Sequence, residues 1–174
     1  MKSGILTRIK REIPEGIWSK CKKCGDTTYQ HALERSAFVC PHCGNHFAIG
    51  HQRYVELLAD AGSFKELNAN VATADPLKFR DHRRYSERIR EARKSSGMKE
   101  AVHTGTCTVG GNLAALAIMD TSFILGSMGG ATGEKIARLI DRALVDRRTL
   151  ILVCQSGGAR MQESTFSLMQ MAKI

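Results

Sequence analysis

The feature that most constrains the fold is a pair of Cys-x-x-Cys motifs near the start of the chain. Their cysteines are Cys21, Cys24, Cys40 and Cys43, with fifteen residues between the motifs. Two residues between cysteines let one tight turn direct both sulfurs at a single metal ion, and two such turns complete a tetrahedron. Gly25 and Gly44 follow the motifs, where the turn backbone needs positive φ. The spacing predicts a zinc ribbon over residues 18–46.

This zinc is predicted to be structural, because four thiolates fill its coordination shell and leave no open position for catalysis. His42 and His46 lie within the ribbon and are interpreted as bystanders. Cys107 and Cys154 stand alone in apolar, strand-like segments. This distribution of cysteines favours metal binding over a disulfide framework.

The charge of the chain makes an anionic partner plausible without identifying it. Lys and Arg number 26 against 17 Asp and Glu, a net charge of +9. Residues 77–94 hold eight basic and three acidic side chains in one predicted helix. This helix could face phosphate groups or an acidic subunit, or it could be a solvated face with internal ion pairs. The pairs considered are Glu87 with Arg83 and Arg84, and Glu91 with Arg88.

Nucleic acid is the alternative partner for the ribbon. Basic side chains surround its cysteines, namely Lys20, Lys22, Lys23 and Arg35. Only 6% of the residues are aromatic, which is few for stacking on bases, and a simple binding module does not need a glycine-rich second half.

The sequence predicts four segments: a leader (1–17), the C4-type ribbon (18–46), a helical bridging region (47–97) and an enzyme core (98–174). The bridging region contains predicted helices at 51–59 and 75–94, the second with Asp75 as N-cap and Pro76 in the first turn. No apolar stretch is long enough to span a membrane and no signal peptide precedes the ribbon, so a cytoplasmic protein is expected. The helical pattern at 167–174 has no stop signal, so truncation is expected.

The core follows an α/β pattern. Strands are predicted at 101–109 and 112–120 around the Gly110-Gly111 turn, followed by a short strand at 122–125, a helix at 133–146, a buried strand at 149–154 and a final helix. In such folds, small-molecule sites gather at the carboxyl ends of strands.

Two glycine-rich segments occupy those positions. In SGGAR (156–160), the amides of Gly157 and Gly158 could stabilise an oxyanion, although a plain turn is the alternative. Ser156 lacks the G-x-S-x-G context of a nucleophile. GSMGG (126–130) has neither the lysine of a phosphate loop nor the GxGxxG spacing, so neither ATP nor NAD is directly indicated.

Several segments in combination carry a family resemblance. They are IPEGIWSKCKKCG (13–25), VCPHCGNHF (39–47), DPLKFRD (75–81), GSMGG (126–130), SGGARMQES (156–164) and SLMQMAK (167–173). In this order they resemble the carboxyltransferase β subunit of bacterial and plastid acetyl-CoA carboxylase, from about residue 12 onward. Members of that family normally continue well beyond the length of this chain.

The resemblance implies a crotonase-like (ClpP/crotonase) spiral of ββα units, here incomplete, behind the zinc ribbon. It implies transfer of a carboxyl group from carboxybiotin to acetyl-CoA, giving malonyl-CoA. By resemblance, Gly157 and Gly158 form a backbone oxyanion hole, supported by a helix starting near Arg160. Gly129, Gly130 and Arg160 are assigned to substrate binding, with tight packing and an internal salt bridge as the alternatives.

The same resemblance implies partners and cofactors. These are the carboxyltransferase α subunit in an α2β2 heterotetramer, the biotin carboxyl carrier protein and biotin carboxylase, within a biotin-dependent, ATP-binding complex. One structural Zn²⁺ per chain and biotin on the separate carrier are expected, with acetyl-CoA and malonyl-CoA as substrate and product. In a plant the location would be the plastid stroma.

Overall fold

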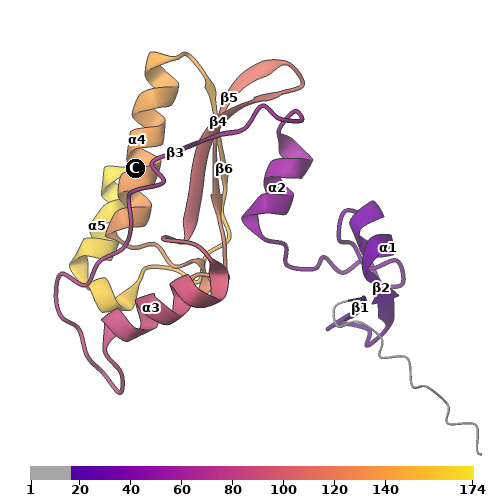
Figure 1. Ribbon diagram of the computed structural model, residues 1–174, viewed down its shortest axis with the longest axis horizontal. Coiled ribbons are helices and arrows are strands. Elements are labelled where there is room, and N and C mark those ends of the chain that lie inside the picture. The colour runs from indigo at the N-terminus through magenta and orange to yellow at the C-terminus, as the bar shows by residue number, and fades with distance from the viewer. Residues whose placement is uncertain (1–16) are drawn as a thin grey trace, which may run out of the picture. The chain divides into compact units, whose positions relative to one another are not determined.

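The structure, a computed structural model, describes residues 17–174. The chain divides into two compact units, Met1–Ile49 and Gly50–Ile174, which are described separately (Figure 1). The predicted leader lies outside the described residues except for Ile17. The predicted boundary after Gly97 does not separate two units, because residues 50–174 form one compact unit.

The first unit is a small ribbon. Strand β1 (Trp18–Lys20) pairs antiparallel with β2 (Thr27–Tyr29), and helix α1 (Gln30–Arg35) follows directly. Each Cys-x-x-Cys turn ends in a glycine with positive φ, +78° at Gly25 and +68° at Gly44, as the sequence predicts. Leu33 is the buried apolar side chain of α1, so this unit has little hydrophobic core of its own.

The second unit is built on a four-stranded sheet in the order β3-β4-β5-β6. Its strands are β3 (Lys65–Leu67), β4 (Val102–Val109), β5 (Asn112–Met119) and β6 (Thr149–Val153). The first three are antiparallel, and β6 is parallel to β5. Its helices are α2 (His51–Leu58), α3 (Tyr85–Ser96), α4 (Gly130–Val145) and α5 (Thr165–Lys173). Strands β4 and β5 with α4 form one ββα unit.

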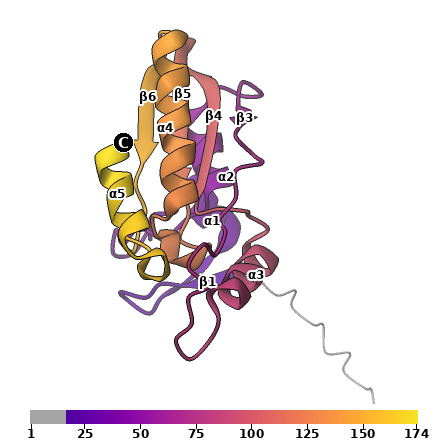
Figure 2. The same ribbon diagram turned by 90° about the vertical axis from the view of Figure 1, so that its left-hand side faces the viewer.

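Alternating side chains of the sheet build a core on each face. On one face, β4 and β5 pack against α4 (Figure 2) through Val102, Ala115, Ala117, Met119, Ile136, Leu139 and Ala143. On the other, Cys107, Ala114, Leu116 and Ile118 pack against α2. Because both faces are covered, β5 is almost wholly buried, and its carboxyl end lies toward the glycine loops.

The predicted helix at 75–94 is wrong in its first half. Asp75 accepts a hydrogen bond from the Phe79 amide at 3.0 Å, but this caps a single turn, and Lys78 adopts a positive φ of +50°. Helix α3 begins only at Tyr85. Its charges pair with the preceding segment and not in the combinations considered from the sequence, since Arg88 pairs with Asp81 and Glu91 pairs with Arg83.

Three further elements differ from the sequence prediction. The segment predicted as a strand at 122–125 ends in a 3₁₀ turn, Ile124–Gly126. Helix α4 begins three residues earlier than predicted. The strand β6 lies at the sheet edge, so Leu150 and Leu152 are 37% and 40% exposed rather than buried. Within residues 17–174, the structure has no helix long and apolar enough to cross a membrane.

Candidate functional site

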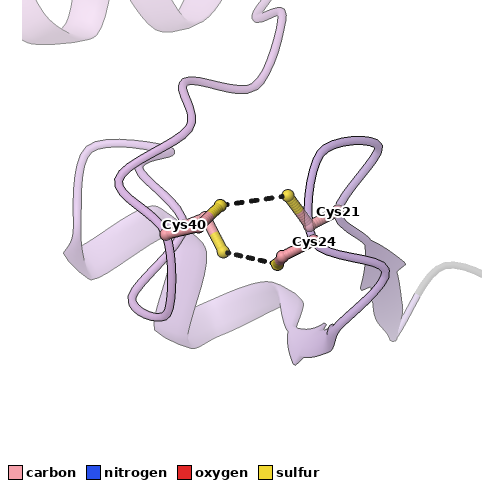
Figure 3. A group of neighbouring side chains, drawn as sticks. Cys21, Cys24 and Cys40 are labelled. Carbon is pink, nitrogen blue, oxygen red and sulfur yellow. Dashed lines mark hydrogen bonds between the residues drawn. The ribbon is translucent and has the colours of Figure 1, made fainter.

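The four cysteines of the ribbon converge on one point (Figure 3). Their sulfur atoms all lie within 4.8 Å of one another, and the Cys21–Cys43 and Cys24–Cys40 pairs are 3.7 Å and 3.8 Å apart. Sulfurs bound tetrahedrally about 2.3 Å from zinc are about 3.8 Å apart, so four sulfurs gathered in this way suit a zinc ion. No histidine joins this cluster among the described residues, and His42 instead faces Asp26.

The thiols of this cluster differ in acidity. The backbone amide of Cys24 lowers the pKa of Cys21 to about 6. The Asp26 amide favours the thiolate of Cys24, but burial and the neighbouring sulfurs outweigh it and raise the pKa of Cys24 to about 12. Four thiolates so close together repel one another without a cation, so metal binding must displace protons.

The two glycine-rich segments found in the sequence lie side by side at the carboxyl ends of β5 and β6. Met128 and Ala159 form a parallel bridge, in which the Met128 amide donates to Gly158 O at 2.9 Å and the Arg160 amide donates to Met128 O at 2.8 Å. Gly126 is required for this approach, because a Cβ there would lie 2.2 Å from the carbonyl oxygen of Gln155. The two motifs are therefore one structural unit.

Gly157 and Gly158 are both exposed on this unit. The Gly157 amide donates to Leu125 O at 2.9 Å, and the Gly158 amide donates to the hydroxyl of Ser156 at 3.0 Å. The hydroxyl of Ser156 can rotate away, whereas the Leu125 carbonyl is backbone, so the Gly158 amide is the one more readily released to a ligand. Gly158 has a φ of +106° and open space where a Cβ would be. Their oxyanion role stays a prediction.

Arg160 is buried in this structure and forms an internal ion pair, and its contact with substrate stays a prediction. It is 1% exposed, and its Nη2 donates to Glu100 Oε1 and to Ser127 O, both at 2.6 Å. Its Nη1 donates to Thr73 Oγ1 at 2.7 Å. Burial alone would lower the pKa of Arg160, but the Glu100 carboxylate raises it above its ordinary value. The alternative interpretation, an internal salt bridge, is confirmed.

Glu163 completes this buried network from the other side. Its Oε2 accepts the Gly130 amide at 2.6 Å, at the N-terminus of α4, and its Oε1 accepts the Tyr85 hydroxyl at 2.6 Å. A Cβ on Gly129 would lie 2.7 Å from both Arg160 Nη1 and Glu163 Oε1. Tight packing against this ion pair therefore accounts for Gly129, and the amide of Gly130 is occupied by a side chain of the protein itself.

No sequence signal singled out the residues that hold the glycine loops in place. They are Thr73, Tyr85, Glu100, Ser127 and Glu163, which converge from segments far apart in the chain. The helix predicted to begin near Arg160 is also displaced, since a 3₁₀ turn precedes α5 and the α-helix starts at Thr165. The N-terminus of α5 therefore lies five residues later in the chain than the position expected to support the Gly157-Gly158 amides.

Fold and site together define a carboxyl transferase, and the chain belongs to that family. The family model described as the carboxyl transferase domain matches residues 52–174, and that of the acetyl-CoA carboxylase zinc finger domain matches residues 18–43. The resemblance and the crotonase-like fold expected from the sequence are confirmed.

The particular relatives are subunits of one enzyme. The chain is 47% identical to acetyl-coenzyme A carboxylase carboxyl transferase subunit beta of Prochlorococcus marinus (strain MIT 9303), over 99% of the chain and 60% of the relative. It is 48% identical to the same subunit of Chlorobaculum tepidum, over 98% of the chain and 61% of the relative. The chain thus spans about three fifths of the length of the curated relatives it matches.

Solved structures with the same fold bind acyl-CoA or malonate. Transcarboxylase 12S with methylmalonyl-coenzyme A and methylmalonic acid bound has a TM-score of 0.56 at 25% identity, over 72% of this chain and 22% of that one. A Pseudomonas malonate decarboxylase hetero-tetramer in complex with malonate has a TM-score of 0.56 at 27% identity, over 72% of this chain and 44% of that one.

Proposed function

We propose that this chain is the zinc-ribbon half-site of an acetyl-CoA carboxyltransferase, moving a carboxyl group from carboxybiotin to acetyl-CoA to give malonyl-CoA. The observation that carries this proposal is the pairing of the two glycine loops, which presents the Gly157-Gly158 backbone at the carboxyl ends of β5 and β6. The names of the relatives identify the substrate class.

The reaction needs a thioester enolate, formed when a proton leaves the methyl carbon, which then attacks the carboxyl carbon. Negative charge develops on carbonyl oxygens, and fixed amide donors stabilise it most effectively where water is excluded. The Gly158 amide is suited to this role, because its present acceptor is a rotatable hydroxyl. The proton acceptor is not assigned to a residue of this chain, since biotin itself can act once it has lost its carboxyl group.

The network around Arg160 positions these donors. Through Ser127 and Met128, Arg160 ties the first glycine loop to the second. Four thiolates fill the coordination shell of zinc and leave no position for a substrate. The role of the metal is therefore to hold the ribbon together.

The proposed partners follow from the same relatives. The subunit name in those relatives favours a second carboxyltransferase chain, which we take to be an α subunit in an α2β2 assembly. The biotin carboxyl carrier protein would deliver carboxybiotin, and biotin carboxylase would use ATP, so no ATP site is assigned to this chain. A cytoplasmic or, in a plant, a stromal location goes with this assignment.

A chimera tests the function. Residues 12–174 of this chain would replace the matching part of the Chlorobaculum tepidum β subunit, and the product would be mixed with its α subunit, acetyl-CoA and carboxybiotin. Malonyl-CoA formation is expected, and Gly158→Val, which fills the open space before the amide, should reduce kcat at least about tenfold. A well-folded chimera that assembles with the α subunit and makes no malonyl-CoA would refute the proposal.

Nucleic-acid binding by the ribbon is a second candidate, favoured by one observation. The rings of Trp18 and Tyr29 are 56% and 42% exposed and lie 5.5 Å apart, beside exposed Lys20. Exposed aromatic rings next to cations suit stacking on single-stranded bases. Nucleic-acid binding predicts salt-sensitive affinity for RNA or DNA that charge reversal at Lys22, Lys23 and Arg35 weakens. Equal affinity of that variant and the wild type would exclude this function.

A further inference from the structure

A cavity of about 600 Å³ lies in the second unit, separate from the glycine loops. It lies beside β3, at the edge of the sheet. This strand is short and pairs with residues 104–106 of β4, so within residues 17–174 the start of β4 has no partner on that side. Its walls come from α2, β3, the end of α3, β4 and α4. The lining is part apolar, through Val55, Phe64 and Met98, and part polar. A cavity of this size and composition suits a small organic molecule.

The buried cationic residue of this lining is Lys135. The residue is 3% exposed, and among the described residues no hydrogen bond or ion pair joins its ammonium group to a partner. Burial lowers the pKa of Lys135, and the carboxylates of Glu66 and Glu100 only partly oppose this effect. A buried lysine without a partner destabilises the folded state. An anion that enters the cavity could form an ion pair with Lys135 that the protein itself does not provide.

The acidic side chains of the cavity are mostly committed elsewhere. Glu100 is held by Arg160 at 2.6 Å and by the Thr132 hydroxyl at 2.9 Å. Glu56 pairs with Arg53 at 2.6 Å. Glu66 lies 3.6 Å from His103, but burial lowers the pKa of that imidazole, so Glu66 is the carboxylate of the lining that pairs with no cation in the described part of the chain. Lys135 and the exposed Lys99 are the cations of the lining available to a ligand.

We propose that this cavity binds an organic anion, with the ligand's phosphate or carboxylate group on Lys135 and Lys99 and its apolar part against Phe64 and Met98. Under the proposed function, coenzyme A is one source of such a group. The site itself rests on the cavity and on Lys135, not on that function, and a binding experiment tests it without turnover.

The test is a titration of the zinc-loaded chain, followed by NMR of isotope-labelled lysine and histidine side chains. The probes are inorganic phosphate, acetate, adenosine 3′,5′-bisphosphate and coenzyme A. Saturable shifts of the Lys135 and His103 signals are expected with at least one probe. Binding of the phosphate compounds alone would assign a phosphate ligand, and binding of acetate alone a carboxylate.

Two variants separate the site from general charge attraction. Lys135→Met keeps the length of the side chain but removes the charge, and should weaken the best probe at least tenfold, whereas Lys135→Arg should retain binding. Lys78→Met, at an exposed position outside the cavity, should bind as the wild type does. Equal affinity in wild type and Lys135→Met would overturn the proposal. If Lys135→Met does not fold, probe-induced shifts in the wild type that spare Lys135 and His103 would overturn it equally.

Discussion

Arg160 illustrates how a buried charge can hold two loops together. Its guanidinium joins Glu100, Thr73 and the backbone of the first glycine loop, and its own amide joins that loop again. The network is nearly sealed from water, since Arg160 is 1% and Glu163 3% exposed. Its members are therefore strongly interdependent.

Arg160→Met should destabilise the second unit by about 3–5 kcal/mol, because it leaves the Glu100 carboxylate buried without its cation. Urea unfolding, followed by circular dichroism, measures the change. Arg138→Met is the control, since Arg138 is 54% exposed and pairs with Glu134 on the same helix, and a change below about 1 kcal/mol is expected there. Equal effects of the two substitutions would mean that the buried network contributes no more than a surface pair.

Gly126→Ala should cost at least about 2 kcal/mol more than Gly110→Ala. Both glycines have positive φ, +68° and +56°, so both variants carry similar backbone strain. Only at Gly126 would the added Cβ meet another atom, the carbonyl oxygen of Gln155 at 2.2 Å, which forces the two glycine loops apart. Thermal and urea unfolding of the pair give the difference, and matched stabilities would show that the loops can separate at no cost.

At the scale of single residues, the sequence predicts those features that depend on short spacings along the chain. The cysteine cluster follows from local turns, so its four ligands could be named in advance. Arg160 could not be placed, because its partners Thr73 and Glu100 are 87 and 60 residues away in the chain. No local pattern specifies such pairings, and the family resemblance assigned Arg160 to substrate binding, with an internal salt bridge as the alternative.

Among the elements, α2 and β4 bring two histidine rings together. His51 and His103 have ring centroids 4.1 Å apart, and Asp120, at the end of β5, accepts both the amide and Nδ1 of His51. Burial first, and then the charge of His51, lower the pKa of His103. Glu66 from β3 opposes this shift, as does Asp120, while Lys135 from α4 adds to it.

This arrangement predicts loss of stability in mild acid. The pKa of His103 is lower in the folded chain than in the unfolded chain, so the unfolded chain binds more protons in mild acid. The contribution of His103 to the free energy of unfolding is therefore complete above about pH 6.5 and is lost as the pH falls below that value. Asp120, with a pKa of about 2, titrates well below this window. Unfolding free energies at pH 7.5 and 5 should differ less in His103→Gln than in wild type, and His82→Gln, at an exposed position, should behave as wild type. An unchanged pH dependence in His103→Gln would contradict this prediction.

Element boundaries were predictable where the apolar pattern is strong. Strands β4 and β5 and helix α4 carry such patterns and were predicted within a few residues. The helix at 75–94 was predicted from its N-cap signal, but Asp75 caps only one turn before the chain extends again to place Tyr85 beside Glu163. The strand β6 looked buried because it is apolar, yet its position at the sheet edge depends on long-range pairing.

On the scale of the whole molecule, the two units rely on different sources of stability. The ribbon has short strands, one six-residue helix and Leu33 as the buried apolar side chain of that helix. The second unit has a sheet covered on both faces by apolar clusters. So small a module as the ribbon needs metal ligation to remain folded, whereas the second unit does not.

Removal of zinc should therefore unfold the ribbon alone. After treatment with 1,10-phenanthroline, amide hydrogen exchange is expected to accelerate by more than about a hundredfold within residues 18–46, and to stay slow in β4 and β5, whose hydrogen bonds lie in the apolar core. Cys43→Ser should have the same effect as the chelator, because three thiolates complete the tetrahedron poorly. Cys154→Ser, at an exposed position outside the cluster, should keep one zinc per chain and full protection. Loss of protection in β4 and β5 upon chelation would show that the metal stabilises the catalytic fold as well, and that the two units do not unfold independently.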